Sequence, residues 1–233
     1  LLPWKDGPVP DAEPKVLATH EDVFFDLAFR PDGRELAAAG SDGLVRVFDV
    51  ATGAERLKIN SHADWVTDIC YSPDGKYIAT ASRDKTAKVF DADSGSLLAT
   101  HSEHGAPVRA IAFAPDSKSV FSAGGSRIRV WNVEDSKLSG EISGFEHDVN
   151  AVIVGGENIF AGSADRTARQ FKLADRTPVR SLASHPSWIL SLAWHEATHR
   201  LSAGCFDGTI AVWDLERGTL VKQFSAFPRA LGE

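Results

Sequence analysis

The 233-residue chain has no methionine, only two cysteines and no long apolar segment. Two cysteines, Cys70 and Cys205, are too few for a disulfide scaffold, and we expect both to be buried free thiols. No apolar run approaches the roughly 18 residues that a membrane-spanning helix needs. The opening stretch LLPWKDGPVPDAEPK lacks a basic start followed by an apolar run, so this segment predicts no signal peptide. Because the first residue is Leu1, we expect a processed or excised piece of a longer chain.

Positive charge is also scarce. The chain has 25 Lys and Arg against 32 Asp and Glu, a formal net charge of −7. Phosphate backbones and anionic membranes attract basic surfaces, so this balance argues against nucleic-acid binding and membrane association. No P-loop, dinucleotide fingerprint or nucleophile elbow is present. We therefore expect no catalytic residues, no cofactor and no metal.

What the sequence does contain is a repeat. The stretch LAFRPDGRELAAAGSDGLVRVFD returns 42 residues later, without a gap, as ICYSPDGKYIATASRDKTAKVFD. Five such units follow one another at about 41 residues, a period typical of propeller blades. Each unit opens at one apolar anchor, and the five anchors are Phe24, Val66, Val108, Val149 and Ile189.

Within a unit the pattern predicts four short strands. Two segments of alternating apolar and polar residues flank a tight turn such as SPDGK, in which Asp-Gly supplies the left-handed backbone that hairpins require. A second turn carries an aspartate in four units: Asp42, Asp84, Asp165 and Asp207. A third strand ends in pairs such as Phe-Asp or Trp-Asp, and a polar turn leads to a fourth strand. Such a sheet cannot bury both faces alone, whereas neighbours stacked around an axis can.

These units resemble WD40 repeats over roughly residues 14 to 225. Besides the turn aspartates, the resemblance rests on loop histidines four residues before the anchors and on the terminal aromatic pairs. The histidines are His20, His62, His104 and His185. The family implies structural roles for these histidines and aspartates, in a hydrogen-bonded set with a strand-two hydroxyl and a strand-three Trp. Only unit two approaches this set, with His62, Thr80, Asp84 and Phe90, so we expect the other units to depend more on packing than on polar networks.

We expect an all-β propeller with five recognisable four-stranded blades, forming part of a larger ring of about seven blades. The blade units are 20–60, 61–103, 104–143, 144–184 and 185–225. A Pro-rich lead covers 1–13 and a tail 226–233. Residues 14–20 resemble a fourth strand and would form one extra N-terminal outer strand. A closed ring of five blades with a loose end is the alternative.

Two sequence patterns could be taken for metal sites. HEATH (His195–His199) matches the zinc-protease motif H-E-x-x-H, which needs a helix to place both histidines on one face. Here it replaces the hairpin turn SPDGK, so we expect a structural or solvent-exposed role. The register histidines lie one to a blade and are too far apart to share a metal ion.

The resemblance also places three positions of each blade on one rim of the ring: the residues flanking the anchor and the residue before the turn aspartate. Exposed Trp, Phe and Arg in one patch are typical of interface centres. Some of these side chains could instead pack against neighbouring blades. The candidate partner-binding residues are Phe25, Trp65, Thr67, Arg83, Arg109, Asn150, Trp188, Leu190 and Phe206. Among them, Arg83 and Arg109 favour an acidic or carboxylate-bearing segment as the ligand.

Two functions fit these observations. The first is a non-catalytic scaffold that binds a protein or peptide on the rim, with self-association or completion by further blades at the ends. The second is an accessory or sensor domain of a larger redox enzyme, because the repeats are also similar to WD40 arrays of large exported bacterial proteins that carry a c-type cytochrome domain. No C-x-x-C-H haem motif lies in this segment. Both a cytoplasmic and an exported location fit these observations.

Overall fold

The computed structural model describes residues 21–183 and 185–226 and contains five antiparallel sheets of four strands each. Blade one comprises β1 (Phe24–Phe29), β2 (Glu35–Gly40), β3 (Leu44–Asp49) and β4 (Glu55–Asn60). Blade two comprises β5 (Val66–Tyr71), β6 (Tyr77–Ser82), β7 (Ala87–Asp91) and β8 (Leu97–His101). Blade three comprises β9 (Val108–Phe113), β10 (Ser119–Gly124), β11 (Arg127–Asn132) and β12 (Leu138–Ile142). Blade four comprises β13 (Val149–Gly155), β14 (Asn158–Ser163), β15 (Ala168–Lys172) and β16 (Pro178–Leu182). Blade five comprises β17 (Ile189–His195), β18 (Arg200–Cys205), β19 (Thr209–Asp214) and β20 (Thr219–Ser225).

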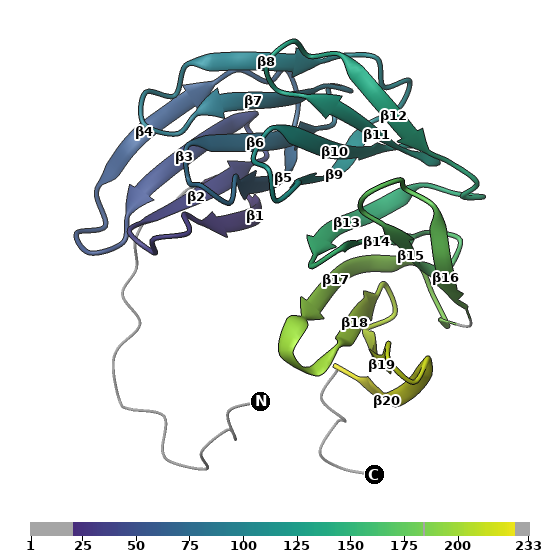
Figure 1. The fold of residues 1–233 in the computed structure, drawn as a ribbon. Helices are drawn as coiled ribbons and strands as arrows, with labels where there is room; N and C mark the ends of the chain where they lie inside the picture. Colours follow the sequence, from purple (N-terminus) through teal and green to yellow (C-terminus); the bar gives the residue numbers. More distant parts are fainter. Residues whose placement is uncertain (1–20, 184, 227–233) are drawn as a thin grey trace, which may run out of the picture.

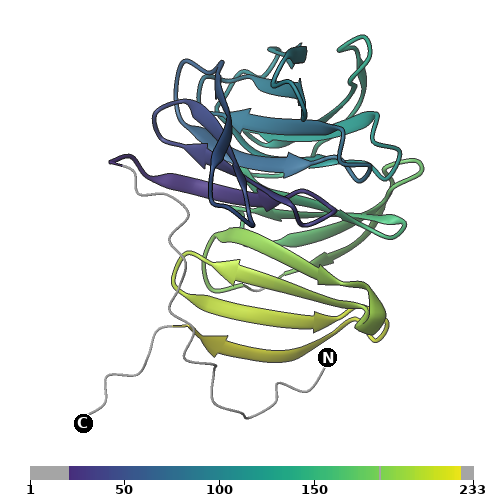
Figure 2. The same ribbon diagram turned by 90° about the vertical axis from the view of Figure 1, so that its left-hand side faces the viewer.

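The blades are arranged as an arc. Within each sheet the strands lie in sequence order, and the first strands β1, β5, β9, β13 and β17 contact one another in succession. Figure 1 shows these strands on the inside of the arc and the fourth strands on the outside, and Figure 2 shows the stacking from the side. This arrangement confirms the predicted all-β propeller architecture. The arc stays open between blade one and blade five (Figure 1). The extra strand expected at 14–20, the lead at 1–13 and His20 lie outside the described residues.

Turn chemistry explains the strand boundaries. In the first hairpins of blades one and two, Gly33 and Gly75 both have φ of 73°, a conformation in which a side chain is strained. The aspartates before them, Asp32 and Asp74, accept the backbone N–H two residues on, at 3.0 and 3.1 Å. These local bonds stop one strand and start the next without tertiary help.

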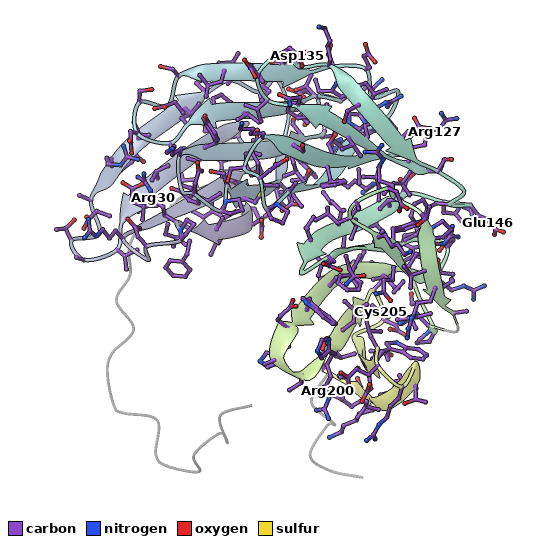
Figure 3. All side chains as sticks on the ribbon, viewed as in Figure 1. Arg30, Arg127, Asp135, Glu146, Arg200 and Cys205 are labelled. Atoms are coloured by element: carbon purple, nitrogen blue, oxygen red, sulfur yellow. The ribbon has the colours of Figure 1, made fainter. Side chains whose placement is uncertain are left out.

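Side chains occupy the space between consecutive blades (Figure 3), and the buried clusters there are apolar. At the first interface, Ile69 and Tyr71 of blade two pack against Ala37, Val45 and Val47 of blade one. Each blade thus offers one face to the blade before it and the other face to the blade after it. Burial of apolar area on this scale is the main stabilising term in such stacked repeats.

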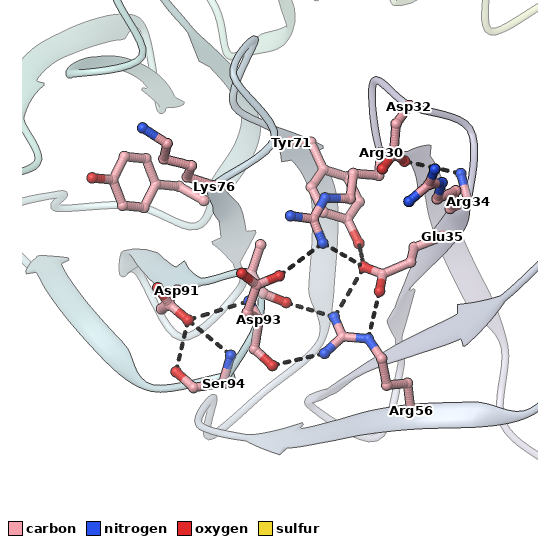
Figure 4. Close-up of polar contacts among 12 residues, drawn as sticks. Arg30, Asp32, Arg34, Glu35, Arg56, Tyr71, Lys76, Asp91, Asp93 and Ser94 are labelled. Carbon is pink, nitrogen blue, oxygen red and sulfur yellow. Dashed lines mark hydrogen bonds and ion pairs between the residues drawn. The ribbon is translucent and has the colours of Figure 1, made fainter.

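A charged cluster ties blade one to blade two at the end of the blades that carries the first hairpin turns (Figure 4). Glu35 lies at its centre, with its carboxylate 2.6 Å from Arg56 Nε and 3.2 Å from Arg30 Nη1. From blade two, Asp93 accepts from Arg30 at 2.9 Å, and its backbone carbonyl accepts from Arg56 at 2.7 Å. The Tyr71 hydroxyl donates to Glu35 at 3.5 Å. Burial and then the Glu35 charge raise the pKa of Tyr71.

The HEATH segment forms the turn that its alignment predicts. Residues Glu196–Thr198 make a single 3₁₀ turn between β17 and β18, and His199 has a left-handed backbone with φ of 47°. His195 Nδ1 lies 2.8 Å from Thr198 Oγ1, and His199 Nε2 lies 3.6 Å from Glu216. The α-helical face that a zinc protease needs is therefore not formed here. Among the described residues, no helix is long and apolar enough to cross a membrane.

A candidate partner-binding rim

One backbone hydrogen bond, repeated from blade to blade, builds the rim. The residue before each turn aspartate donates its N–H to the carbonyl of the residue before the anchor. This bond joins Arg83 to Trp65 at 2.9 Å and Phe206 to Trp188 at 2.8 Å. Blades one and four form it between Ser41 and Val23 and between Ala164 and Asp148. The register therefore brings two of the three predicted positions of a blade side by side.

An aromatic cluster lies where blades one and two meet. The rings of Phe25 and Trp65 have centroids 5.0 Å apart, and the Arg83 guanidinium stacks over the indole at 4.7 Å. Trp65 is still 41% exposed. Stacking restricts the rotamers of this Trp while leaving much of its apolar surface in water, which suits a preorganised contact residue.

A second aromatic cluster lies on blade five. Trp188 and Phe206 have ring centroids 5.6 Å apart and are 52% and 65% exposed. Leu190, two residues after Trp188, is also exposed. Scattered single apolar side chains are ordinary on a surface, whereas these three exposed apolar side chains lie close together on one blade.

The residues that follow the anchors line a central hollow. Phe25, Thr67, Arg109, Asn150 and Leu190, one from each blade, contribute to a cavity of about 580 Å³ on the axis of the arc. Two of them are occupied in holding blades together. Thr67 Oγ1 donates to the Val108 carbonyl at 2.7 Å, and Asn150 Nδ2 donates to the Ile189 carbonyl at 2.9 Å.

Both rim arginines have carboxylate partners. Arg109 Nε lies 3.1 Å from Asp148 Oδ2, and Arg83 Nε lies 3.7 Å from Asp64 Oδ2. The sequence comparison treats these arginines as cations that favour an acidic ligand. In the structure each arginine lies beside an exposed carboxylate of this chain, so an acidic ligand would compete with that neighbour, and the preference stays a prediction.

The structural histidines vary from blade to blade. In blade two, His62 Nδ1 lies 2.9 Å from Asp84 and Nε2 lies 2.7 Å from Thr80 Oγ1. Burial opposes ionisation of Asp84, but hydrogen bonds from Thr86 and His62 lower its pKa to about 2. In blade five, Trp213 Nε1 donates to His185 Nε2 at 3.3 Å, and Asp207 accepts the Thr209 N–H at 3.0 Å.

Blade three contains a polar chain that the sequence comparison missed. Trp131 Nε1 donates to Ser122 Oγ at 3.0 Å, and Ser122 Oγ lies 2.8 Å from His104 Nε2. Arg129 Nη1 donates to His104 Nδ1 at 3.3 Å, so the histidine proton lies on Nε2. Burial, together with Arg129 and His101, lowers the pKa of His104 to about 3. The Ser and Trp at their register positions are the signal that could have revealed this chain.

In blades one and four an arginine of the third strand pairs with the turn aspartate. Arg46 Nη2 lies 2.6 Å from Asp42, and Arg169 Nη2 lies 2.8 Å from Asp165, each pair four residues apart across the turn. In blade four, Phe145 occupies the loop-histidine position and Arg169 stacks on its ring at 4.5 Å. The turn aspartates of these two blades thus have charged partners, and the expected greater dependence on packing than on polar networks stays a prediction.

No group of three His, Cys, Asp or Glu side chains within the described ranges is placed to hold a metal ion. Both cysteines are free, with Cys205 buried and Cys70 partly exposed on the central hollow.

The family profile "WD domain, G-beta repeat" matches residues 13–49, 53–91, 95–132 and 176–214, about two thirds of the chain. The chain belongs to the WD40 family. The match leaves out 133–175, which contains the first three strands of blade four, the blade in which Phe145 stands at the loop-histidine position. This WD40 chain is 29% identical over 98 residues to the F-box/WD repeat-containing protein sel-10 of Caenorhabditis elegans, which covers 41% of the chain and 16% of that protein. It is 27% identical over 93 residues to a periodic tryptophan protein 2 homolog of Schizosaccharomyces pombe, covering 39% of the chain and 11% of that protein. The chain thus matches less than a fifth of the length of these curated relatives.

Solved WD40 structures share the fold. A structure of U3-55K and a crystal structure of the RRP9 WD40 repeats each superpose with a TM-score of 0.84 at 23% identity. Each superposition covers 91% of this chain and 67% or 66% of the solved chain. About a third of each of those chains has no counterpart here.

Proposed function

We propose that this WD40 chain is a non-catalytic protein-interaction scaffold that holds a peptide segment of a partner protein across the rim. The observation that carries the proposal is the pair of exposed aromatic clusters, Phe25 with Trp65 and Trp188 with Phe206, in which Trp65 and Trp188 hold equivalent positions of the repeat. Water-exposed indoles gain free energy when a partner covers them, and Trp is enriched among residues that dominate binding. WD40 membership supports a binding role in general, although a fold by itself does not specify a partner.

The side chains on the rim indicate which residue types the bound peptide segment should carry. Because Arg83 and Arg109 are already paired, the remaining attraction is apolar and aromatic, so the segment should present bulky apolar side chains. The alternative of an accessory domain of a redox enzyme is not favoured, since none of the named relatives is described as a redox protein.

The test is quantitative capture. Wild-type chain, the Trp65→Ala/Trp188→Ala variant and a Leu98→Ala control are used to capture proteins from extract of the source cells, and candidate partners are then purified for binding measurements. Leu98 is 47% exposed on the outer strand β8, away from the rim, so its truncation should leave binding unchanged. Truncating a central interface Trp commonly costs about 2 kcal/mol or more, so the double variant should bind at least about tenfold more weakly.

Melting curves of all three proteins control for folding. Equal affinity of the wild type and the double variant for the purified partner would exclude the rim as the binding surface.

A further inference from the structure

The turn between the third and fourth strands has a left-handed residue in each of the five blades. These residues are Gly53, Gly95, Ser136, Arg176 and Gly218, with φ between 57° and 80°. Three blades thus place glycine where the backbone needs a positive φ, and blade three places a small serine. Blade four places a long charged side chain there, although this conformation strains a residue that has a Cβ. Strained residues of this kind are concentrated at binding and switch sites.

The Arg176 side chain reaches across to blade three. A Cβ placed on Gly140 of β12 would lie 2.9 Å from Arg176 Cζ, so the guanidinium rests against the backbone there. At the first interface the sizes are reversed, because Leu57 holds the register position of Gly140 and Gly95 holds that of Arg176. An apolar side chain fills the space at that interface without any charge. Space filling therefore does not explain why blade four has an arginine at this turn.

No carboxylate within the part of the chain that the structure describes pairs with the Arg176 guanidinium, which belongs to a partly buried residue. Two carboxylates of the same region have other partners. Glu141 lies 3.0 Å from Arg127 Nη1. Asp165 lies 2.8 Å from Arg169 Nη2. A partly buried cation without a counter-ion is costly, and an anionic ligand would relieve that cost.

Arg176 borders a groove between blades three and four. The groove has a volume of about 570 Å³, and Ile142 of β12 together with Phe171 and Val179 of blade four contribute to its lining. Because β12 and β16 are the outer strands of their sheets, the groove lies on the outside of the arc (Figure 1). Its described lining residues do not include those of the predicted rim.

The groove is positively charged although the chain is acidic. Arg180 also lines it, and Arg180 Nη1 donates to the neutral Leu215 carbonyl at 2.6 Å. With the two ion pairs above set aside, Arg176 and Arg180 leave the groove positive in a chain of net charge −7. Val179, which is 41% exposed, adds apolar surface beside them. The planar fork of an arginine matches the two oxygens of a carboxylate.

We propose that this groove, lined by Ile142, Phe171, Arg176, Val179 and Arg180, binds an extended acidic peptide segment of a partner protein. Carboxylates of the segment would pair with Arg176 and Arg180, and its apolar side chains would cover Val179. The acidic remainder of the chain repels such a segment, which favours this groove over other surfaces. The groove is separate from the rim, so this proposal does not depend on the proposed function of the rim.

Fluorescence anisotropy with a synthetic probe tests the proposal. The probe is a short fluorescein-labelled peptide in which Glu and Val alternate, and the control peptide has Gln in place of each Glu. We expect the 233-residue chain to bind the Glu peptide and to bind the Gln peptide at least about tenfold more weakly. Arg176→Gly should weaken binding of the Glu peptide at least about tenfold. It should keep the fold, because glycine holds this position in blades one, two and five.

Two further variants separate the charge of Arg176 from its other effects. Arg176→Gln keeps most of the side-chain bulk and should weaken binding as Arg176→Gly does. Arg166→Gly is the matched control, since Arg166 is an exposed arginine of the same blade with φ of 66°. It should bind the Glu peptide as the wild type does, and melting curves of all four proteins check folding.

Failure of the wild type to bind the Glu peptide would overturn the proposal, and so would equal binding by Arg176→Gln. An equal loss in Arg166→Gly would also overturn it, because binding would then follow the total charge of the chain rather than the groove.

Discussion

Removing the charge of Glu35 should loosen the junction between blades one and two. The Glu35 side chain is only 12% exposed and holds Arg56 through two contacts, at 2.6 and 2.9 Å, and Arg30 through one at 3.2 Å. Glu35→Gln removes the carboxylate that Arg56 contacts, whereas Arg30 keeps Asp93 at 2.9 Å. Breaking a buried ion pair from one side costs about 3–5 kcal/mol.

The expected loss is smaller here because water reaches both arginines. The side chains of Arg30 and Arg56 are 19% and 31% exposed, so solvent screens part of the unpaired charge. We therefore expect Glu35→Gln to lower the free energy of unfolding by about 2–3 kcal/mol. For a chain of this size, that loss corresponds to a fall in melting temperature of about 4–12 °C.

Urea denaturation and thermal melting of four proteins measure this effect: wild type, Glu35→Gln, Arg56→Ala and the double variant. The double variant should recover at least about 1 kcal/mol relative to the sum of the single variants, because the uncompensated charge is removed. Glu55→Gln is the matched control, since Glu55 is 42% exposed and 3.7 Å from Arg46. Additive effects, or an equal loss in the Glu55 control, would refute the reasoning.

Two further predictions concern the histidines. Burial, Arg129 and His101 lower the pKa of His104 from the reference value of 6.5 to about 3 in the folded chain. Between these two pH values the unfolded chain therefore binds a proton at His104 that the folded chain does not bind. Lowering the pH from 7 to 5 should therefore reduce the free energy of unfolding by about 2 kcal/mol through His104. Urea denaturation at both pH values should show a smaller reduction in His104→Asn than in wild type or in the control His195→Asn, which changes an exposed histidine. Zinc should leave the melting temperature unchanged, because His195 and His199 flank a 3₁₀ turn rather than sharing a helical face; a rise that disappears in His195→Ala/His199→Ala would restore the zinc site.

Much of the fold follows from local sequence. The period of about 41 residues, the alternation within each strand and the Asp-Gly turns depend on neighbours along the chain, so they can be read before folding. Gly33 and Gly75 stand where the backbone needs a positive φ, and HEATH stands where a hairpin turn belongs. Registering the repeats also predicts which positions share the rim, and one backbone hydrogen bond between two of these positions recurs in blades one, two, four and five.

Tertiary structure decided how each position is used. Phe29 and Tyr71 hold the same repeat position, yet Phe29 is 63% exposed and Tyr71 is 8% exposed because Tyr71 packs on the preceding blade. The pairing of Arg83 with Asp64 and of Arg109 with Asp148 joins residues whose closeness depends on side-chain rotamers and, for Arg109, on a neighbouring blade, neither of which appears in an alignment of repeats. The ion pairs of Arg46 with Asp42 and of Arg169 with Asp165 are likewise visible only once the strands have paired across the turn. Local sequence therefore determined the blades and their turns. Packing between blades determined which charged side chains are paired, which side chains are buried and which face water, because these properties depend on contacts between residues about 40 positions apart.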